Sequence, residues 1–270
     1  MAKANRANDH IASLRKHVDE FRASDPYTLT PEPTETPERL AYRLRILKEP
    51  PVVISATIGD VLHNQRAALE NLAFELAKHN HGGQLTPDQE KDTSFPIYQD
   101  PGKFDENFAK SKRHTLYGDK AIRAFRSVQP FAILEQAKKH GVALDEPYDD
   151  GFRNSSLYRL DRLWNIDKHR RLTVMAWWLD IIYWGSDGDS KRRASRGDGT
   201  MAHNSILFYI EGTDEGMGSE VSHKFNLVLK DDPAFFIDGG ESTEDVVRLL
   251  QGFQQHLSYI FSVVFTAMSQ

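Results

Sequence analysis

The chain has 270 residues, a formal net charge of -5 and no cysteine. The lack of cysteine excludes a disulfide framework, a cysteine-based zinc site and a cysteine nucleophile. A hydrophobic fraction of 39% suffices for a globular core and, with 27% charged residues, excludes a collagen-like or mainly disordered chain.

Two kinds of targeting segment are not found in the sequence. The first 21 residues contain no apolar run of the length that a secretory signal needs. No stretch approaches about 18 consecutive apolar residues, the length that predicts a membrane-spanning helix. We therefore expect a cytoplasmic protein without a membrane partner.

The first half of the chain alternates between helical and extended patterns. Apolar residues at helical spacing predict amphipathic helices over residues 5–23 and 55–78. Between them, repeated proline predicts a stiff connector over residues 24–38, and period-two alternation predicts a strand over residues 39–47. Glycine and proline then separate three short predicted helices, at residues 103–110, 119–128 and 130–140.

The second half begins and ends with a helix. Apolar spacing predicts helices over residues 155–172 and 243–267. Residues between them rich in β-branched and aromatic side chains predict three antiparallel strands, at residues 173–184, 205–211 and 223–229. Four glycines and mixed charges predict a flexible loop over residues 185–202.

The order of these elements indicates an α+β fold, because the strands cluster and do not alternate with helices. We expect a single domain over residues 1–270. Its helical bundle would contain two long central helices and the C-terminal helix, beside a small antiparallel sheet. Phosphate-binding loops, dinucleotide fingerprints, zinc-protease motifs and nucleophile elbows are all absent from the sequence.

A first polar cluster interrupts the apolar pattern of the predicted helix over residues 55–78. Asp60 precedes His63 by three residues and Asn64 by four, so all three lie near one face of the helix. Asp60 could then hold the His63 ring in one orientation. The alternative is a partly buried histidine whose polar atoms are satisfied by its neighbours.

A second polar cluster occupies the predicted helix over residues 155–172. Arg162 and His169 are seven residues apart, nearly two turns, so both point the same way about 10 Å apart. Arginine would bind a phosphate bidentately, histidine would move a proton, and Asn165 between them would orient the group. Alternatively, Lys168 and its basic neighbours suit the helix dipole in the last turn, with Asp167 and His169 as a buried anchor.

Two motifs resemble a recurring pattern in bacterial proteins that have a similar length and no established activity. The first is GDxLHN, in the segment GDVLHNQRAALENLAFEL at residues 59–76. The second is NxDKHR, in the segment LWNIDKHRRLT at residues 163–173. The resemblance implies that the two polar clusters belong to one site or to one structural junction.

The second cluster also resembles the HEPN superfamily of helical ribonucleases. Their mark is an arginine followed on a helix by a histidine after four to six residues, and Arg162 and His169 match with six between them. Leu163 takes a position that is usually polar. The resemblance implies metal-independent RNA cleavage without a cofactor, in which the 2′-OH attacks its own phosphate. His169 would act as acid or base, and Arg162 would stabilise the developing charge.

RNA is the partner that this resemblance implies, and a homodimer is the assembly, as in a toxin or defence effector. Two other functions stay open. A non-catalytic binding or structural protein would bury and pair the Asp60/His63 and Asp167/His169 groups between helices. A metal-dependent hydrolase would bring Asp60, His63 and His169 to within about 2.0–2.2 Å of one metal ion.

Overall fold

The structure, a computed structural model, describes residues 2–36, 39–140, 155–183, 193–196, 202–211, 221–233 and 244–270. Its helices are α1 (Ala2–Arg22), α2 (Val52–Asn80), α3 (Pro87–Asp92), α4 (Pro101–Phe104), the π-helical turn η1 (Asp105–Ala109), α5 (Lys112–Ser127), α6 (Pro130–Lys139), α7 (Ser156–His169) and α8 (Val246–Ser269). Its strands are β1 (Tyr27–Pro33), β2 (Arg39–Ile46), β3 (Val174–Tyr183), β4 (Arg193–Arg196), β5 (Ile206–Glu211) and β6 (Val221–Leu229).

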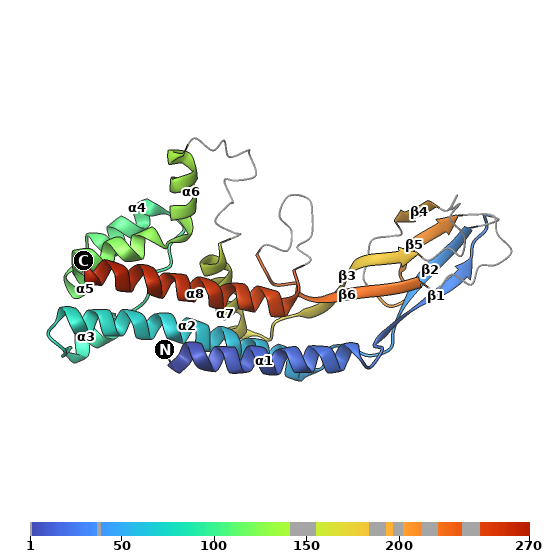
Figure 1. Cartoon of the computed structure of the whole chain (residues 1–270), viewed down its shortest axis with the longest axis horizontal. Coiled ribbons are helices and arrows are strands. Elements are labelled where there is room, and N and C mark those ends of the chain that lie inside the picture. The colour runs from blue at the N-terminus through green and yellow to red at the C-terminus, as the bar shows by residue number, and fades with distance from the viewer. Residues whose placement is uncertain are drawn as a thin grey trace.

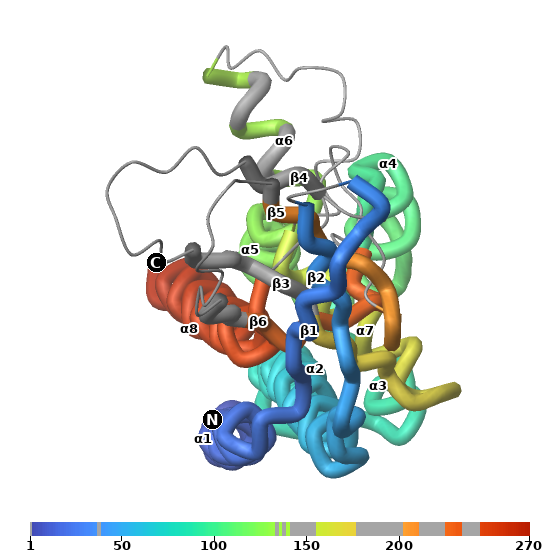
Figure 2. Tube along the Cα trace, turned by 90° about the vertical axis from the view of Figure 1, so that its right-hand side faces the viewer, coloured from blue at the N-terminus to red at the C-terminus, as the bar shows by residue number. Residues whose placement is uncertain are grey.

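A bundle of long helices forms one end of an elongated molecule, and the strands extend from it at the other end (Figure 1). Helices α1, α2 and α8 lie side by side, as the view from the sheet end also shows (Figure 2). Helix α7 has only 14 residues and crosses α2 and α8, so α1 takes the place of the third long helix. The predicted α+β class is confirmed.

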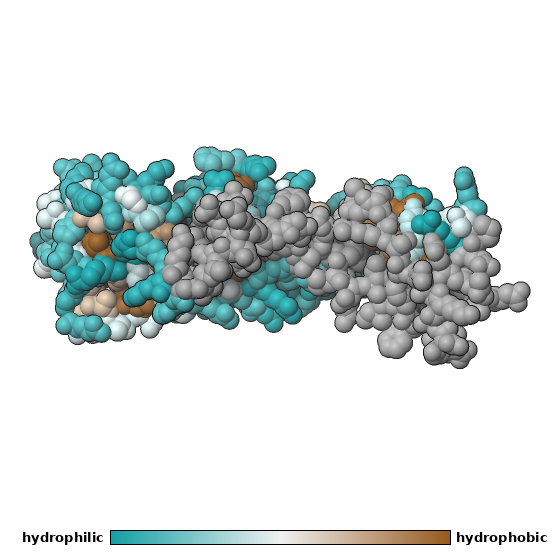
Figure 3. All heavy atoms as spheres, turned by 90° about the horizontal axis from the view of Figure 1, so that it is seen from above, coloured by the Kyte–Doolittle hydropathy of each residue, from teal (hydrophilic) through white to brown (hydrophobic). Residues whose placement is uncertain are grey.

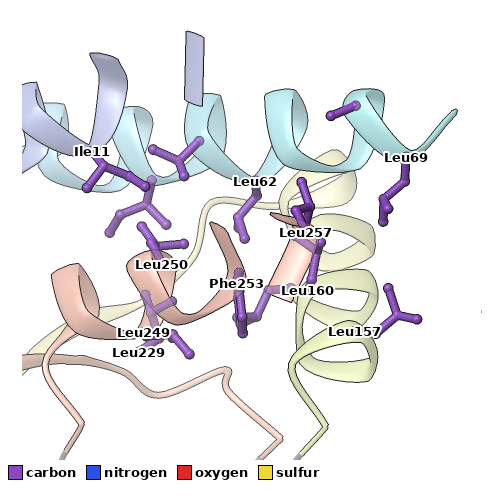
Figure 4. Close-up of a cluster of buried hydrophobic side chains, with 14 of the residues drawn as sticks. Ile11, Leu62, Leu69, Leu157, Leu160, Leu229, Leu249, Leu250, Phe253 and Leu257 are labelled. Carbon is purple, nitrogen blue, oxygen red and sulfur yellow. The ribbon is translucent and has the colours of Figure 1, made fainter. Parts of the chain in front are cut away.

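The bundle is held together by apolar stripes that meet between the helices. Figure 4 shows leucines from α2, α7 and α8 pointing into one cluster around Phe253. The labelled residues of this cluster are buried: Ile11, Leu62, Leu69, Leu157, Leu160, Leu229, Leu249, Leu250, Phe253 and Leu257. Burial of each such side chain contributes about 1.5–3 kcal/mol to the stability of the fold. The apolar residues at helical spacing are therefore the ones that pack the helices together.

An aromatic cluster closes the bundle end that lies away from the sheet. Phe108 stacks on Tyr117 at 5.2 Å between ring centroids, and both rings meet Phe125 edge-on. The Tyr117 hydroxyl accepts from the Ser94 amide at 2.9 Å, and burial raises the pKa of Tyr117 to about 12. The Phe95 amide donates to Glu70 on α2 at 2.9 Å, so this segment is fixed against both α5 and α2.

The strands form two antiparallel sheets. A long two-stranded ribbon, β3–β6, leads away from the bundle, and a four-stranded sheet has the order β1-β2-β5-β4. Tyr42 of β2 stacks on Phe208 of β5 at 4.7 Å between ring centroids, which anchors the centre of the larger sheet. The strands predicted at residues 39–47, 173–184, 205–211 and 223–229 are all present, but they are divided between the two sheets.

The connector predicted over residues 24–38 is wrong for its middle part, which forms β1. Pro31 pairs with Tyr42 and Pro33 with Leu40 in the register of the ladder. A proline cannot donate to a neighbouring strand, so it is tolerated where a strand lies at the edge of a sheet, and β1 is such an edge strand. Proline content alone therefore did not distinguish a connector from an edge strand.

The prediction of a flexible loop over residues 185–202 is wrong for one stretch of four residues. Arg193–Arg196 forms β4, which pairs with β5 at the opposite edge of the four-stranded sheet. Residue 202 precedes the turn into β5, and the other residues of the predicted loop lie outside the described ones. Within the described part of the chain, every helix is too short or too polar to cross a membrane.

Candidate functional site

Helix α7 carries the predicted Arg–His pair on the side that faces away from the core. Its inner face is apolar, with Leu157, Leu160 and Leu163 fully buried. This burial explains the leucine at position 163, which lies on the core side of the helix. Arg162 and His169 are both exposed. Seven residues of α-helix place their Cα atoms about 10 Å apart on one side.

An ion pair fixes the first turns of α7. Arg159 donates to both carboxylate oxygens of Asp232, at 2.9 and 2.5 Å, and to Glu244 at 2.9 Å. Asp232 is 8% exposed, so this bidentate pair is shielded from solvent. The segment after β6 and the segment before α8 are thereby both tied to α7.

A second, more buried group of charges joins α7 to α2. Arg66 is 7% exposed, and its guanidinium lies 2.6 Å from a Glu70 oxygen and 3.6 Å from a carboxylate oxygen of Asp161. It also donates to the Phe95 carbonyl at 3.3 Å and lies 5.2 Å from the centre of the Trp164 ring. We call Arg66, Glu70, Asp161 and Trp164 the Arg66 junction.

The sequence analysis missed the Arg66 junction. Its only local signal is the spacing of four between Arg66 and Glu70, which suits a pair on one helix face. Burial raises the pKa of Asp161, although the charges of Arg66, Lys168 and Arg162 act in the opposite direction. Cations from two helices therefore offset part of the cost of burying this carboxylate.

The side-chain amide nitrogen of Asn165 bonds within its own helix. Its side-chain amide donates to the backbone oxygen of Asp161 at 2.9 Å and to the Asp161 carboxylate at 3.1 Å. It therefore positions Asp161 within α7. Asn64 makes a similar local bond on α2, where its amide donates to the Asp60 carbonyl at 2.8 Å.

The basic residues in the last turn of α7 have separate partners. The Lys168 ammonium lies 3.1 Å from the centre of the Trp164 ring, a cation–π contact on the surface of the junction. Arg170 donates to Asp231 at 2.7 Å, and Asp231 also accepts from the Thr173 amide at 2.6 Å. Both contacts fix the end of α7, where His169 lies.

The two predicted clusters do meet, through Asp167. Gly59 on α2 approaches so closely that a Cβ atom built there would lie 2.6 Å from an Asp167 carboxylate oxygen. Partial burial and the nearby charge of Asp60 raise the pKa of Asp167, while His63 lowers it. Asp60 and His63 are exposed, so this is a half-open junction and not the buried, paired one that the structural alternative expects.

The remaining expectations concern a metal ion and a cleft. Among the described residues, no three histidine, aspartate or glutamate side chains converge where they could hold a metal ion. Asp60, His63 and His169 therefore do not form the ligand set of the metal alternative. Arg162 and His169 line none of the hollows that lie along the described helices, between α2 and α8 and between α1 and α8.

Comparison with protein-family models, with curated protein sequences and with solved structures finds no match for this chain. The functional conclusion is therefore carried by the chemistry of α7. Its features are an exposed arginine and an exposed histidine on one face of a helix that buried ion pairs hold in place.

We expect Gly59→Ala to lower the free energy of unfolding by about 1–3 kcal/mol, because the added methyl meets the Asp167 carboxylate. Urea denaturation measures this loss. Gly252→Ala on α8 is the matched control, because a Cβ there meets nothing within 4 Å, and it should be neutral or stabilising by up to about 1 kcal/mol. Asp167→Ala combined with Gly59→Ala should recover stability, and failure to recover would contradict the assigned contact.

Asp167→Asn should raise the melting temperature at neutral pH. The pKa of Asp167 is raised in the folded state, so the folded protein binds its proton more tightly than the unfolded chain does. The stability of the wild type therefore decreases as the pH rises through the pKa of Asp167. An asparagine cannot ionise, so the variant does not lose this stability. The gain should vanish near pH 3, where the carboxyl is protonated in both states.

Thermal unfolding at both pH values measures this difference. Asp88→Asn is the control, because the Asp88 side chain is 96% exposed and should show no such gain. A variant at position 167 that melts below wild type at neutral pH would overturn the assignment.

Proposed function

We propose that the solvent face of α7 binds RNA and cleaves it without a metal ion, with Arg162 on the phosphate and His169 transferring a proton. The observation that carries this proposal is the exposure of both side chains on one face of an anchored helix. An exposed Arg–His pair on a helix that could rotate or unwind would not keep one geometry. Here Arg159 and the Arg66 junction fix both the start and the middle of α7.

The separation of the two side chains suits a phosphodiester between them. Their Cα atoms are about 10 Å apart, and both side chains are long enough to reach a group lying along the helix face. A guanidinium binds two phosphate oxygens at once, in a fixed fork. Histidine is the side chain whose unperturbed pKa best suits proton transfer near neutral pH.

The reaction would use the substrate's own nucleophile. The 2′-oxygen forms a bond to phosphorus while the bond from phosphorus to the 5′-oxygen breaks, giving a 2′,3′-cyclic phosphate and a 5′-hydroxyl. His169 takes the proton from the 2′-OH while water protonates the departing 5′-oxygen, or it protonates the 5′-oxygen while water takes the proton of the 2′-OH. Arg162 stabilises the charge that develops on the phosphoryl oxygens.

The supporting residues act through α7 and do not touch the substrate. Asp161 attracts both Arg162 and Lys168, and Asn165 holds the Asp161 carboxylate in place. Lys168 adds positive charge beside the site while it rests on Trp164. The positive character of the site is therefore local, in a chain with a net charge of -5.

Binding of RNA without cleavage is the second candidate. The observation that favours it is the position of Arg162 and His169 outside the hollows along α8, because a site that does not exclude water gains less from electrostatic stabilisation. The two candidates share Arg162 as a phosphate ligand and differ in the chemistry of His169.

Incubation of the purified protein with mixed RNA, with and without EDTA, tests the proposal. We expect cleavage that survives EDTA, and a loss of about 100-fold or more in rate for His169→Ala and for Arg162→Ala. His10→Ala and Arg6→Ala on α1 are matched controls that should cleave at the wild-type rate. RNA with 2′-O-methyl groups should bind and stay intact.

The outcomes separate the candidates. Products that end in a 2′,3′-cyclic phosphate support the proposed step. Binding that depends on Arg162, without any cleavage, would replace it with the second candidate. Activity that survives in His169→Ala, or that EDTA abolishes, would contradict a metal-independent reaction at this histidine.

A further inference from the structure

A hollow lies between α2 and α8, at the bundle end that lies away from the sheet. Its volume of about 380 Å³ falls within the range of about 300–1,000 Å³ that is typical of small-molecule sites. Helix α1 fills the same groove nearer the sheet, where Gln254 donates to the Ala4 carbonyl at 3.1 Å. The hollow continues this groove beyond α1, and hydrophobic residues reach the surface at this end (Figure 3).

The two long walls of the hollow are apolar. Leu72 and Leu76 of α2 form one wall and are buried. Phe261, Phe265 and Met268 of α8 form the other, with the two phenylalanine ring centroids 6.5 Å apart. Aromatic rings and a thioether pack favourably against a further aromatic ring. Since an apolar cavity of about 150 Å³ holds one benzene ring, the hollow has room for about two rings.

A row of polar side chains on α2 borders the apolar wall. Asn71, Glu75 and His79 follow one another at intervals of four, so all three line the hollow, and all are exposed at its rim. Within the part of the chain that the structure describes, none of these three side chains forms a hydrogen bond or an ion pair. The residues around the hollow include no lysine or arginine, and α8 contains no charged residue after Arg248. Glu75 is therefore the carboxylate that a bound molecule meets.

We propose that this hollow binds a small amine, with an apolar body of about two aromatic rings between α2 and α8 and a protonated nitrogen at the Glu75 carboxylate. The carboxylate accepts a charge-assisted hydrogen bond from the ammonium group, and the side-chain oxygen of Asn71, one turn away, is a second acceptor. A ligand of the same shape with a carboxylate in place of the amine would be repelled by Glu75. The site lies apart from Arg162 and His169 and does not rest on the proposed cleavage of RNA.

Calorimetric titration of the full chain with three probes of one shape tests the head group. The probes are naphthylmethylamine, naphthylmethanol and naphthoic acid, which carry a positive charge, no charge and a negative charge at neutral pH. We expect the amine to bind about tenfold more tightly than the alcohol, and the acid more weakly than both. This factor is at the lower end for a charged hydrogen bond because the rim is open to solvent.

A charge-removing variant assigns the preference to one residue. Glu75→Gln should weaken binding of the amine about tenfold and leave binding of the alcohol unchanged. Glu90→Gln on α3 is the matched control, because Glu90 is also exposed but does not line the hollow, and it should bind all three probes like wild type.

Methionine methyl signals in NMR spectra locate the bound probe. The Met268 signal, assigned by its loss in Met268→Leu, should shift when the amine binds, and the Met175 signal on β3 should not. A folded protein that binds none of the probes at millimolar concentration, or that binds the amine without a shift at Met268, would overturn the site. Equal affinity for the amine and the alcohol, or wild-type affinity for the amine in Glu75→Gln, would overturn the role of Glu75.

Discussion

The buried guanidinium of Arg66 is the interaction on which the arrangement of the helices depends. It lies on α2, pairs with Glu70 on the same helix, reaches Asp161 on α7 and binds the carbonyl of Phe95. A cation at 7% exposure without such partners would cost several kcal/mol of folding free energy. Asp161 on α7 and the Phe95 carbonyl both lie against this one group, so the cation joins α7 and the aromatic segment to α2.

Anchoring α7 from one side leaves its other side to solvent. The leucine face and Asp161 are used for packing, so Arg162 and His169 lie on the side away from the core. On α8 the same division gives a different surface, because its exposed positions after Arg248 hold polar, small and aromatic side chains and no charged residue. The bundle therefore presents to solvent one face with Arg162 and His169 on α7 and another, uncharged one on the later part of α8.

Local patterns predicted what is determined locally. The spacing of apolar residues along the chain is enough to predict the helices α2 and α8 and the strand β2. The sequence therefore indicated these elements with bounds close to those observed. β1 was missed because its tolerance of Pro31 and Pro33 comes from its place at a sheet edge, which no local pattern records.

The candidate site shows the same limit. The resemblance of the two motifs to a recurring pattern implied that the Asp60/His63 cluster and the α7 cluster belong to one site or one junction, and Asp167 lies against Gly59 between them. The roles of individual side chains could not be read in the same way. Asn165 and Asn64 bond to their own helices, and Arg66 takes its importance from Asp161, nearly a hundred residues further along the chain.

Titration of the histidine ring protons by NMR with an uncleavable 2′-O-methyl dinucleotide tests the central claim most directly. The His169 signal, assigned by its loss in His169→Gln, should shift on binding, and the His10 signal on α1 should not. The shift should disappear in Arg162→Ala, because the phosphate is then no longer held beside the ring. A His169 signal that stays unchanged at saturating dinucleotide would contradict a phosphate site on α7.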